Sequence, residues 1–403
     1  MAENLIKQEL AKGQLLSIVK LVAFMIEEAQ NMRASDIHID PQGGGIRVRY
    51  RIDGVLKEFY SLPIRLHSEI ISRIKIISGL RTDEHRVPQD GRLRMVADAR
   101  PLDVRVSVAP TYHGENAVLR LLSDNAEAFT LESLGFSKEN AQKIEIAAKK
   151  PYGMILATGA TGSGKTTTLY TLLKGLNTEE VSIVTIEDPV EYSIDGIQQI
   201  QVNSRTGLAF ATGLRSILRQ DPNIIMVGEI RDSETAGVAV NAALTGHLML
   251  STLHTNDAAT ALPRLLDMQI ESFLIASTVN VVIGQRLVRR ICSDCKTERK
   301  MILAEEKSLG GAISAAIMGG QREFYYGKGC EKCGNTGYRG RVGIHEVLAP
   351  DAAIRDAILR KASAGEVRQI AIKGGMIPIV EDGFAKAQSG VTTIDEVLRM
   401  FYE

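Results

Sequence analysis

The sequence predicts an α/β protein in which a doubly wound parallel-sheet domain follows a smaller α+β domain. Short, continuous apolar runs separated by helical segments begin near Tyr152, and strands buried on both faces of a parallel sheet require such runs. Before that point apolar and polar residues alternate, as in antiparallel strands with one solvated face. The chain has 403 residues, 44% hydrophobic and 24% charged, which excludes a disordered or fibrous protein.

Composition also limits the classes of partner. Lys+Arg 48 and Asp+Glu 48 give a formal net charge of zero, so the chain has no overall basic field for nucleic acid. The absence of Trp, with only 5% aromatic residues, argues against a stacking platform for single strands. No apolar run reaches the roughly 18 residues of a membrane span, and the N-terminus has no export pattern. We therefore expect a cytoplasmic protein without a transmembrane segment or a nucleic-acid partner.

Residues 1–122 are predicted to form the α+β domain. Apolar residues recur at helical spacing over 14–32, and a second helix is expected over 64–78. Asp53-Gly54 predicts a tight hairpin between two of the strands, which are expected at 36–40, 46–52, 55–60, 93–96, 102–108 and 117–122. The second strand carries three arginines on one face, which we interpret as solvated rather than as a binding site: Arg47, Arg49 and Arg51.

The parallel-sheet domain is expected over 151–290, after a linker and helix at 123–150. Its strands are the apolar runs GMILAT, VSIVTI, NIIMVG and HLMLST. A cysteine-containing subdomain is expected over 291–348, and the tail, 349–403, is expected to be helical.

The run GATGSGKT, from Gly159 to Thr166, follows the first apolar run and precedes a helical one, which is the context of a P-loop. Backbone N–H groups of such a loop converge on phosphates, Lys165 adds a positive charge, and Thr166 offers a hydroxyl to Mg²⁺. A glycine-rich turn without a ligand does not account for the flanking strand and helix. We therefore predict that ATP and Mg²⁺ bind at Gly159, Ala160, Thr161, Gly162, Ser163, Gly164, Lys165, Thr166 and Thr167.

Carboxylates follow two other apolar runs. Glu187 and Asp188 come directly after one run, and Glu229 and Asp232 after another. Gly228 stands where many P-loop proteins carry the Asp that anchors Mg²⁺, so Glu229 is the first carboxylate at that strand end. There it is expected to orient or deprotonate water, or to help hold the metal. A strand-end carboxylate that only faces solvent is the alternative.

His247 and His254 flank the run LMLSTL. Their offset of seven would put them on opposite faces of one strand, so at least one is expected in a loop. From the spacing alone, a core histidine and a sensor of phosphate or water both stay open.

All four cysteines fall in two CxxC pairs separated by residues 296–329: Cys292, Cys295, Cys330 and Cys333. Four thiolates complete a tetrahedral Zn²⁺ site and leave no position for substrate, so the zinc is expected to be structural. Independent cysteines or a disulfide are alternatives that a reducing compartment disfavours. The basic run RLVRRICSDCK keeps a nucleic-acid zinc ribbon as a rival.

The P-loop and the runs IEDPVEY, VGEIRD and TGHLMLSTLHTND, in this order, resemble the type II/type IV secretion ATPase family. The similarity is to the assembly motors of type II secretion systems and type IV pili, and it covers about residues 15–403. ASDIHIDP, VPQDGR and CGNTGYRGRVGIHEVL support it.

The resemblance implies a PAS-like first domain, a RecA-like second domain with a zinc-knuckle subdomain, and a homo-hexamer. It implies that Glu229 is the catalytic glutamate of an atypical Walker B motif, that Glu187 belongs to an acidic box, and that His247 and His254 belong to a histidine box. It also implies arginines that neutralise the γ-phosphate: Arg105 and Arg120 of the first domain, and Arg215, Arg219 and Arg264 of the second.

The resemblance further implies an ATP-hydrolysing motor at the cytoplasmic face of the inner membrane, acting on a membrane platform protein. The cysteine pairs favour assembly over retraction. A retraction motor, a DNA-uptake or conjugation relative, a nucleic-acid translocase and an inactive scaffold are the alternatives. Assembly motors usually carry a further N-terminal domain, whereas only some 14 residues precede the first helix expected here, which indicates a shortened chain or a short natural form.

Overall fold

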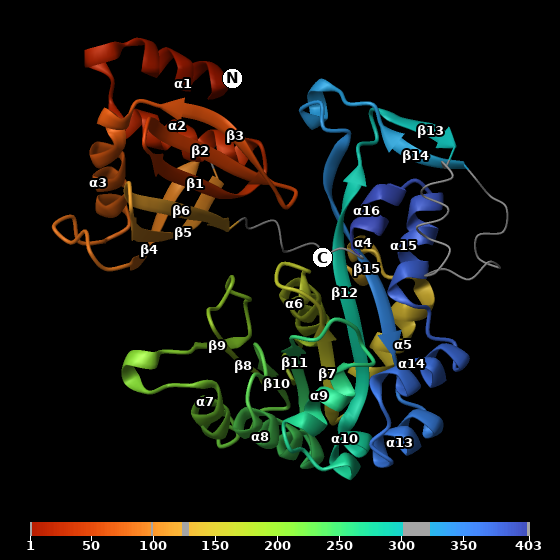
Figure 1. The fold of residues 1–403 in the computed structure, drawn as a ribbon. Coiled ribbons are helices and arrows are strands. Elements are labelled where there is room, and N and C mark those ends of the chain that lie inside the picture. Colours follow the sequence, from red (N-terminus) through yellow and green to blue (C-terminus); the bar gives the residue numbers. More distant parts are fainter. Residues whose placement is uncertain (1, 98–99, 123–128, 301–322, 401–403) are drawn as a thin grey trace. The chain divides into compact units, whose positions relative to one another are not determined.

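The computed structural model describes residues 2–97, 100–122, 129–300 and 323–400, and the chain divides into two compact units, 1–127 and 128–403 (Figure 1). The boundaries expected after residues 150, 290 and 348 fall inside the second unit. Parts of the expected linker (123–128), cysteine subdomain (301–322) and tail (401–403) lie outside the described residues.

The first unit is an antiparallel six-stranded sheet in the order β3-β2-β1-β6-β5-β4. Alternate strand residues such as Val48 and Tyr50 are buried in one core with the apolar sides of helices α2 (Ile18–Asn31) and α3 (His67–Ile77). The α+β domain expected from the alternating pattern is therefore present. Its strands are β1 (Ala34–Gln42), β2 (Gly45–Ile52), β3 (Val55–Leu62), β4 (Gln89–Ala97), β5 (Arg100–Thr111) and β6 (Gly114–Leu122).

Two local features of this unit bear on the sequence-based expectations. Asp53 and Gly54 have φ values of 50° and 88°, which is the left-handed backbone of a type I′ hairpin turn, so the predicted hairpin is confirmed. The N-terminal residues form an additional helix, α1 (Ala2–Ala11), which is not among the elements expected from the sequence. Its Glu9 Oε1 accepts a hydrogen bond from the Ser17 backbone N–H at 2.8 Å, and Ser17 caps α2, which explains why α2 starts later than expected.

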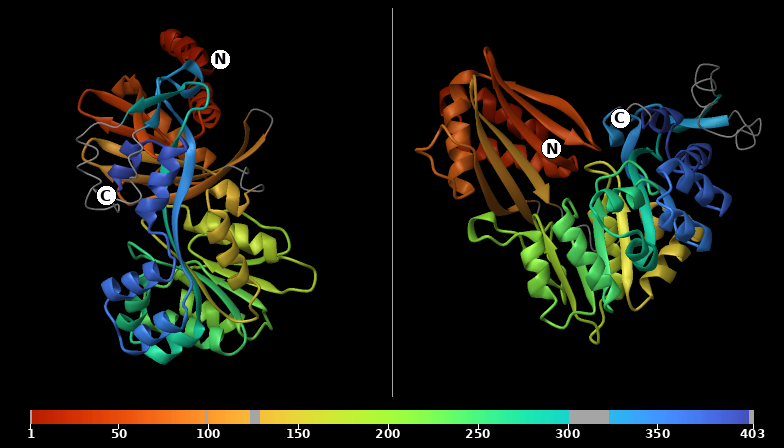
Figure 2. Two further views of the ribbon diagram at one scale, coloured as in Figure 1. Left: turned by 90° about the vertical axis from the view of Figure 1, so that its right-hand side faces the viewer. Right: turned by 60° about the horizontal axis from the view of Figure 1, so that its bottom comes forward.

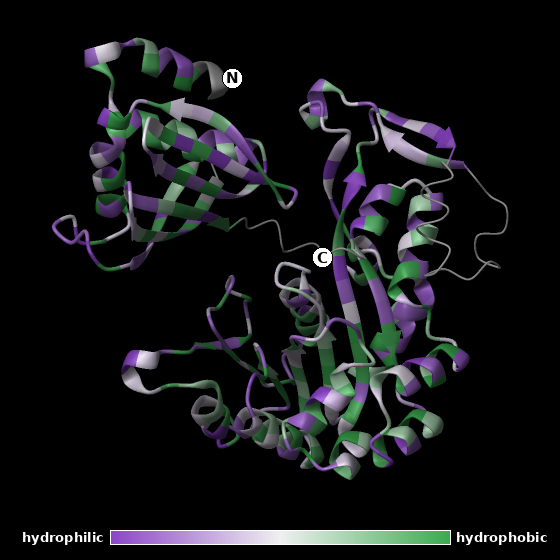
Figure 3. Cartoon of the chain, in the orientation of Figure 1, coloured by the Kyte–Doolittle hydropathy of each residue, from purple (hydrophilic) through white to green (hydrophobic). Residues whose placement is uncertain are grey.

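The second unit contains a seven-stranded sheet in the order β15-β12-β7-β11-β10-β8-β9. All strands are parallel except β15, and the four predicted apolar runs are confirmed as β7 (Gly153–Thr158), β8 (Ile183–Glu187), β10 (Ile224–Val227) and β11 (Leu248–Leu253). Figure 3 shows these short strands in hydrophobic colours. Three further strands were not expected: β9 (Gln198–Gln201), β12 (Val279–Ile291) and β15 (Tyr338–Leu348).

Both faces of this sheet are covered, as the continuous apolar runs predict (Figure 2). Met154 and Leu156 of β7 face one core, and Ile155 and Ala157 face the other. The first core includes helices α7 (Phe210–Ile217), α8 (Ser233–Leu244), α9 (Ala261–Asp267), α10 (Ser272–Thr278), α13 (Ala352–Leu359) and α14 (Ala364–Lys373). The second includes α4 (Leu131–Leu134), α5 (Lys138–Ala148) and α6 (Lys165–Leu176).

Strands β12 and β15 pair with each other from Val282–Leu348 to Ile291–Tyr338, well past the point where β12 leaves β7 (Figure 1). The far end of this hairpin carries the cysteines and a small sheet of β13 (Lys296–Lys300) and β14 (Glu323–Gly327). A separate small core joins it to the last two helices, α15 (Ile379–Gln388) and α16 (Ile394–Arg399). The helical tail expected from the sequence is confirmed.

Candidate functional site

Residues 159–164 form a turn between β7 and α6, as the P-loop pattern predicts. Gly159, Gly162 and Gly164 have φ values of 141°, 78° and 88°, which residues with a Cβ rarely adopt. A Cβ on Gly159 would lie 2.3 Å from the backbone oxygen of Gln285. The tight path of the turn therefore needs glycine for both its dihedral angles and its close approach to β12.

Several groups in this turn suit an anion. Lys165 Nζ is buried and donates hydrogen bonds to the backbone oxygens of Gly159 (2.8 Å) and Ala160 (3.0 Å). Burial lowers the pKa of Lys165, and neighbouring Arg286 acts in the same direction. Ser163 Oγ is buried and has no hydrogen-bond partner among the described residues. With the free N–H groups at the start of α6, this donor set fits a phosphate.

Glu229 lies just beyond β10, at the sheet edge that carries the phosphate loop. Its Oε1 is 2.5 Å from the Arg231 guanidinium, and its Oε2 is 2.9 Å from His254 Nε2. Glu229 and Lys165 also interact electrostatically. The structure thus brings Glu229 and His254, two of the predicted residues, to the phosphate loop. Arg231 was missed, although its place two residues after Glu229 in the run EIRD could have indicated it.

Glu187 ends β8, but its carboxylate points into the protein. It accepts hydrogen bonds from Thr185 Oγ1 (2.6 Å), from Tyr170 OH and from Gln199 Nε2 (3.3 Å). Burial raises the pKa of Glu187 despite these donors. Asp232, the other acidic residue noted after a strand, caps α8 by accepting from the Thr235 N–H at 2.7 Å.

His247 and His254 lie at opposite ends of β11. His247 precedes the strand, and its backbone oxygen accepts from the Gly153 N–H at the start of β7. Because β7 and β11 are parallel, about 20 Å of strand separates His247 from the phosphate loop. Both histidines lie outside the strand, which agrees with the expected loop position, but only His254 is brought to the loop of the same chain.

The three arginines predicted in the second unit are exposed. Arg215 pairs with Glu234 at 2.6 Å, and Arg219 donates to the Arg215 backbone oxygen at 2.9 Å. Arg264 lies on the exposed side of α9. In the part of the chain that the structure describes, none of these side chains contacts the phosphate loop.

Arg105 and Arg120 of the first unit are direct cross-strand neighbours on β5 and β6. Arg120 Nε lies 3.0 Å from Oδ1 of Asp36, and Arg51 Nε lies 3.3 Å from Oδ2 of the same carboxylate. Ion pairs of this kind continue over the arginine face of β2, where Arg47 and Arg49 pair with Glu58 and Asp40. This agrees with the interpretation of that face as solvated.

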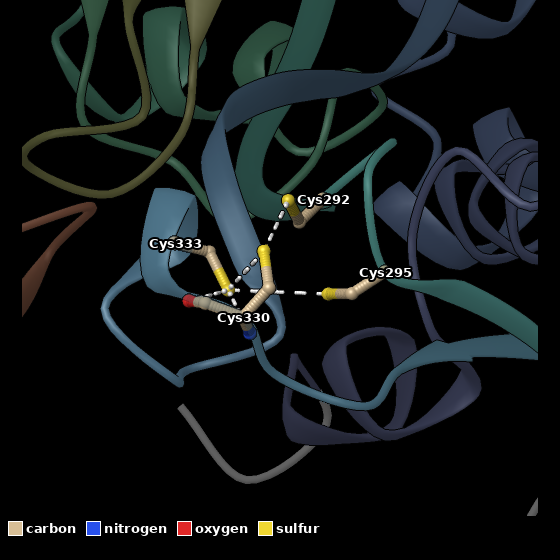
Figure 4. A group of neighbouring side chains, drawn as sticks. All are labelled: Cys292, Cys295, Cys330 and Cys333. Carbon is tan, nitrogen blue, oxygen red and sulfur yellow. Dashed lines mark hydrogen bonds between the residues drawn. The ribbon is translucent and has the colours of Figure 1, made fainter.

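The four cysteines gather at the far end of the β12–β15 hairpin (Figure 4). Their sulfurs all lie within 4.8 Å of one another, and three of the sulfur–sulfur distances are 3.7 to 3.9 Å. Four ligands in tetrahedral geometry at 2.3 Å from zinc would be about 3.8 Å apart. Although burial opposes it, N–H donors from Cys330 and Gly337 lower the pKa of Cys333 to about 6. The donor set therefore fits Zn²⁺, and all four cysteines are free of disulfides.

The chain is similar to known proteins over almost all of its length. The family described as "Type II/IV secretion system protein" matches residues 12–399. The type IV pilus assembly ATPase PilB of Thermus thermophilus is 49% identical over 94% of this chain and 42% of its own length. The type II secretion system protein E of Xanthomonas campestris pv. campestris is 47% identical over 95% of this chain and 67% of its own length. The chain thus spans less than half of the first relative.

Among solved structures, the pilus retraction motor PilT with bound ADP has a TM-score of 0.64 at 26% identity, over 94% of this chain and 96% of its own. No helix within the described ranges is both long and apolar enough to span a bilayer.

Proposed function

Because this chain belongs to the type II/IV secretion system protein family, we propose that it hydrolyses ATP as a subunit of a motor that assembles type IV pili or type II secretion pseudopili. The observation that carries the proposal is the joint placement of Lys165, Glu229 and His254 at the edge of one sheet, around a turn built for phosphate. Relatives named for pilus assembly and type II secretion are 45–49% identical, whereas the retraction motor is 26% identical. Assembly is therefore favoured over retraction.

ATP would bind along residues 159–167. Lys165 and the N–H groups of the turn would hold the β- and γ-phosphates, and the Thr166 hydroxyl would be a ligand of Mg²⁺. When bound, Mg²⁺ supplies charge stabilisation to the phosphate oxygens. The unpartnered Ser163 hydroxyl is a further donor for the same anion.

Glu229 would accept the proton of the attacking water. The water oxygen bonds to the γ-phosphorus, the bond to the bridging oxygen breaks, and ADP and phosphate leave. Arg231 and His254 each contact one carboxylate oxygen of Glu229 and hold the carboxylate in place.

Arginines from neighbouring subunits of a homo-hexamer would complete the charge stabilisation. We propose this role for Arg105 and Arg120 of the PAS-like unit and for Arg215, Arg219 and Arg264 of the RecA-like unit. The side chains of the last three are exposed. One arginine of this kind can raise the rate by about 10³–10⁵. We also propose that Glu187, of the acidic box, and His247, of the histidine box, take part in the catalytic site. Their positions support no contact with ATP bound to their own chain.

The motor would act at the cytoplasmic face of the inner membrane, on a platform protein of the pilus or secretion system. The four cysteines would hold one structural Zn²⁺, with no part in the reaction. Nucleic acid is not a proposed partner.

The test is ATP turnover measured against protein concentration, with zinc determined on the same sample. We expect turnover per subunit to rise cooperatively as the chain assembles, because the arginines act between subunits, and we expect one zinc per chain. Turnover that is independent of concentration would contradict the shared site. Restoration of retraction but not of assembly in cells lacking each motor would contradict the assembly assignment.

A further inference from the structure

The side chain of Gln285 on β12 links this strand to the phosphate loop. Its Nε2 donates to the Ser163 backbone oxygen at 2.6 Å, and its Oε1 accepts from Thr168 Oγ1 at 2.7 Å. Only 2% of Gln285 is exposed. A backbone oxygen can only accept, so the amide orientation follows from the partners themselves.

The phosphate loop meets Gln285 at both of its ends. At the start, a Cβ on Gly159 would lie 2.3 Å from the Gln285 backbone oxygen, and at the end, a Cβ on Gly164 would lie 2.8 Å from Gln285 Nε2. The sheet places Gln285 here, because Gly284 is in register with Thr158, the last residue of β7. Backbone and side chain of one residue thus define the space that the loop occupies.

This link has a consequence for the energetics of the loop. A turn with three glycines at positive φ has many alternative conformations, and ordering it when a ligand binds costs free energy. By fixing the Ser163 carbonyl on the side of β12, the amide leaves the N–H groups at the start of α6 free to face a phosphate. The next residue, Arg286, lies beside Lys165 and near the Gly159 position.

We propose that Gln285 is a positioning residue of the nucleotide site, which holds the phosphate loop ready for the triphosphate through the Ser163 carbonyl and the Thr168 hydroxyl. The proposal rests on the nucleotide binding proposed above. It predicts that loss of this link weakens nucleotide binding even where the protein stays folded.

The test uses three variants of the full chain and a fluorescent ATP analogue with Mg²⁺. Gln285→Met keeps the size of the side chain and removes both hydrogen bonds; Thr168→Val removes one. Thr171→Val is the matched control, because its hydroxyl donates to the Thr167 backbone oxygen within α6. Dissociation constants are measured at a temperature well below each variant's melting point.

We expect the dissociation constant to rise about tenfold for Gln285→Met, which corresponds to about 1.4 kcal/mol, about threefold for Thr168→Val, and less than twofold for Thr171→Val. The double variant should bind no more weakly than Gln285→Met alone, because both changes break one link. In turnover assays, KM should rise with the dissociation constant.

Three outcomes would count against the proposal. If the unchanged chain does not bind the analogue, the proposed function fails and this inference fails with it. If the unchanged chain binds and Gln285→Met binds equally well, with only a lower melting temperature, Gln285 is purely structural and this inference alone is overturned. If Gln285→Met does not fold, an unchanged affinity of Thr168→Val overturns it.

Discussion

The phosphate loop and the tetracysteine arm (residues 288–300 and 323–342) are both connected to β12. The loop is bonded to Gln285 of this strand, and the arm begins with its last residues and continues into Cys292. The two regions differ in the interactions that stabilise them. The loop sits on a sheet whose two faces are covered by large apolar cores. The arm extends past that sheet and shares only a small core with α15 and α16.

Ion pairs and a hydrogen bond to the C-terminal segment stabilise the arm in addition to its small core. Arg289 pairs with Glu396 at 2.6 Å, Arg299 pairs with Asp395 at 3.1 Å, and Thr392 donates to the Arg289 backbone oxygen. The comparison shows that two equally clear sequence motifs can depend on different sources of stability. Apolar burial supports the loop before any ligand arrives, whereas the arm, with its small core, depends on its contacts with the C-terminal helices and on the zinc proposed for its four cysteines.

Metal removal should have the largest effect and should separate the two regions. A structural Zn²⁺ of this type contributes about 10–16 kcal/mol of apparent binding free energy at pH 7. We expect chelation, or Cys333→Ser, to remove one zinc per chain and to speed hydrogen exchange in the arm, α15 and α16, while β7 and α6 keep their protection. Ser293→Ala, an exposed neighbour within the first cysteine pair, is the matched control. Equal loss of protection in β7 and α6 would show that the two regions unfold together.

The second largest effect is expected at the other region. Glu229→Gln keeps the shape of the side chain but removes the base, so ATP turnover should fall about 1,000-fold while nucleotide binding and zinc content are retained. Glu145→Gln is the control, because that carboxylate is exposed on α5 and has no proposed part in the reaction. Wild-type turnover in Glu229→Gln would remove Glu229 from the reaction.

Much of both regions, and of the first unit, could be predicted from local sequence. The phosphate turn, the strand before it and the hairpin at Asp53-Gly54 are each encoded within a few residues, because glycine backbone angles and apolar runs are local properties. The gathering of four cysteines was also predictable, since their chemistry leaves few alternatives.

Contacts between distant segments could not be predicted in the same way. Gln285 reaches Ser163 only because β12 pairs with β7, and nothing near Gln285 in the sequence indicates that pairing. Strand β9 has the sequence QQIQ, whose polar residues suit the edge of a sheet but show no apolar pattern. For the same reason the buried position of Glu187 depends on Tyr170 and Gln199, which lie elsewhere in the chain.

A third prediction compares two ties between the arm and α16. Glu396 is almost fully buried, with 6% of its side chain exposed. Arg289→Met would leave its carboxylate without the guanidinium, although the hydrogen bond from the backbone N–H of residue 289 is kept. We expect a loss of about 3 kcal/mol in the free energy of unfolding, measured with urea. Arg299→Met is the control, because its partner Asp395 is 62% exposed, and its loss should stay below about 1 kcal/mol. Equal losses of unfolding free energy in the two variants would mean that burial of the carboxylate does not determine how much its ion pair contributes to stability.

The smallest effect should have the opposite sign. Arg341 is exposed and lies directly opposite Arg289 in the β12–β15 register, so two like charges face each other across the strands. Like charges in this position destabilise a sheet, so Arg341→Gln should raise the free energy of unfolding by about 0.3 kcal/mol, with less gain at high salt. In an Arg289→Met background the gain should vanish, because the opposing charge is gone. A gain of the same size in both backgrounds would show that the effect comes from Arg341 alone and that the arm is not strained by this pair.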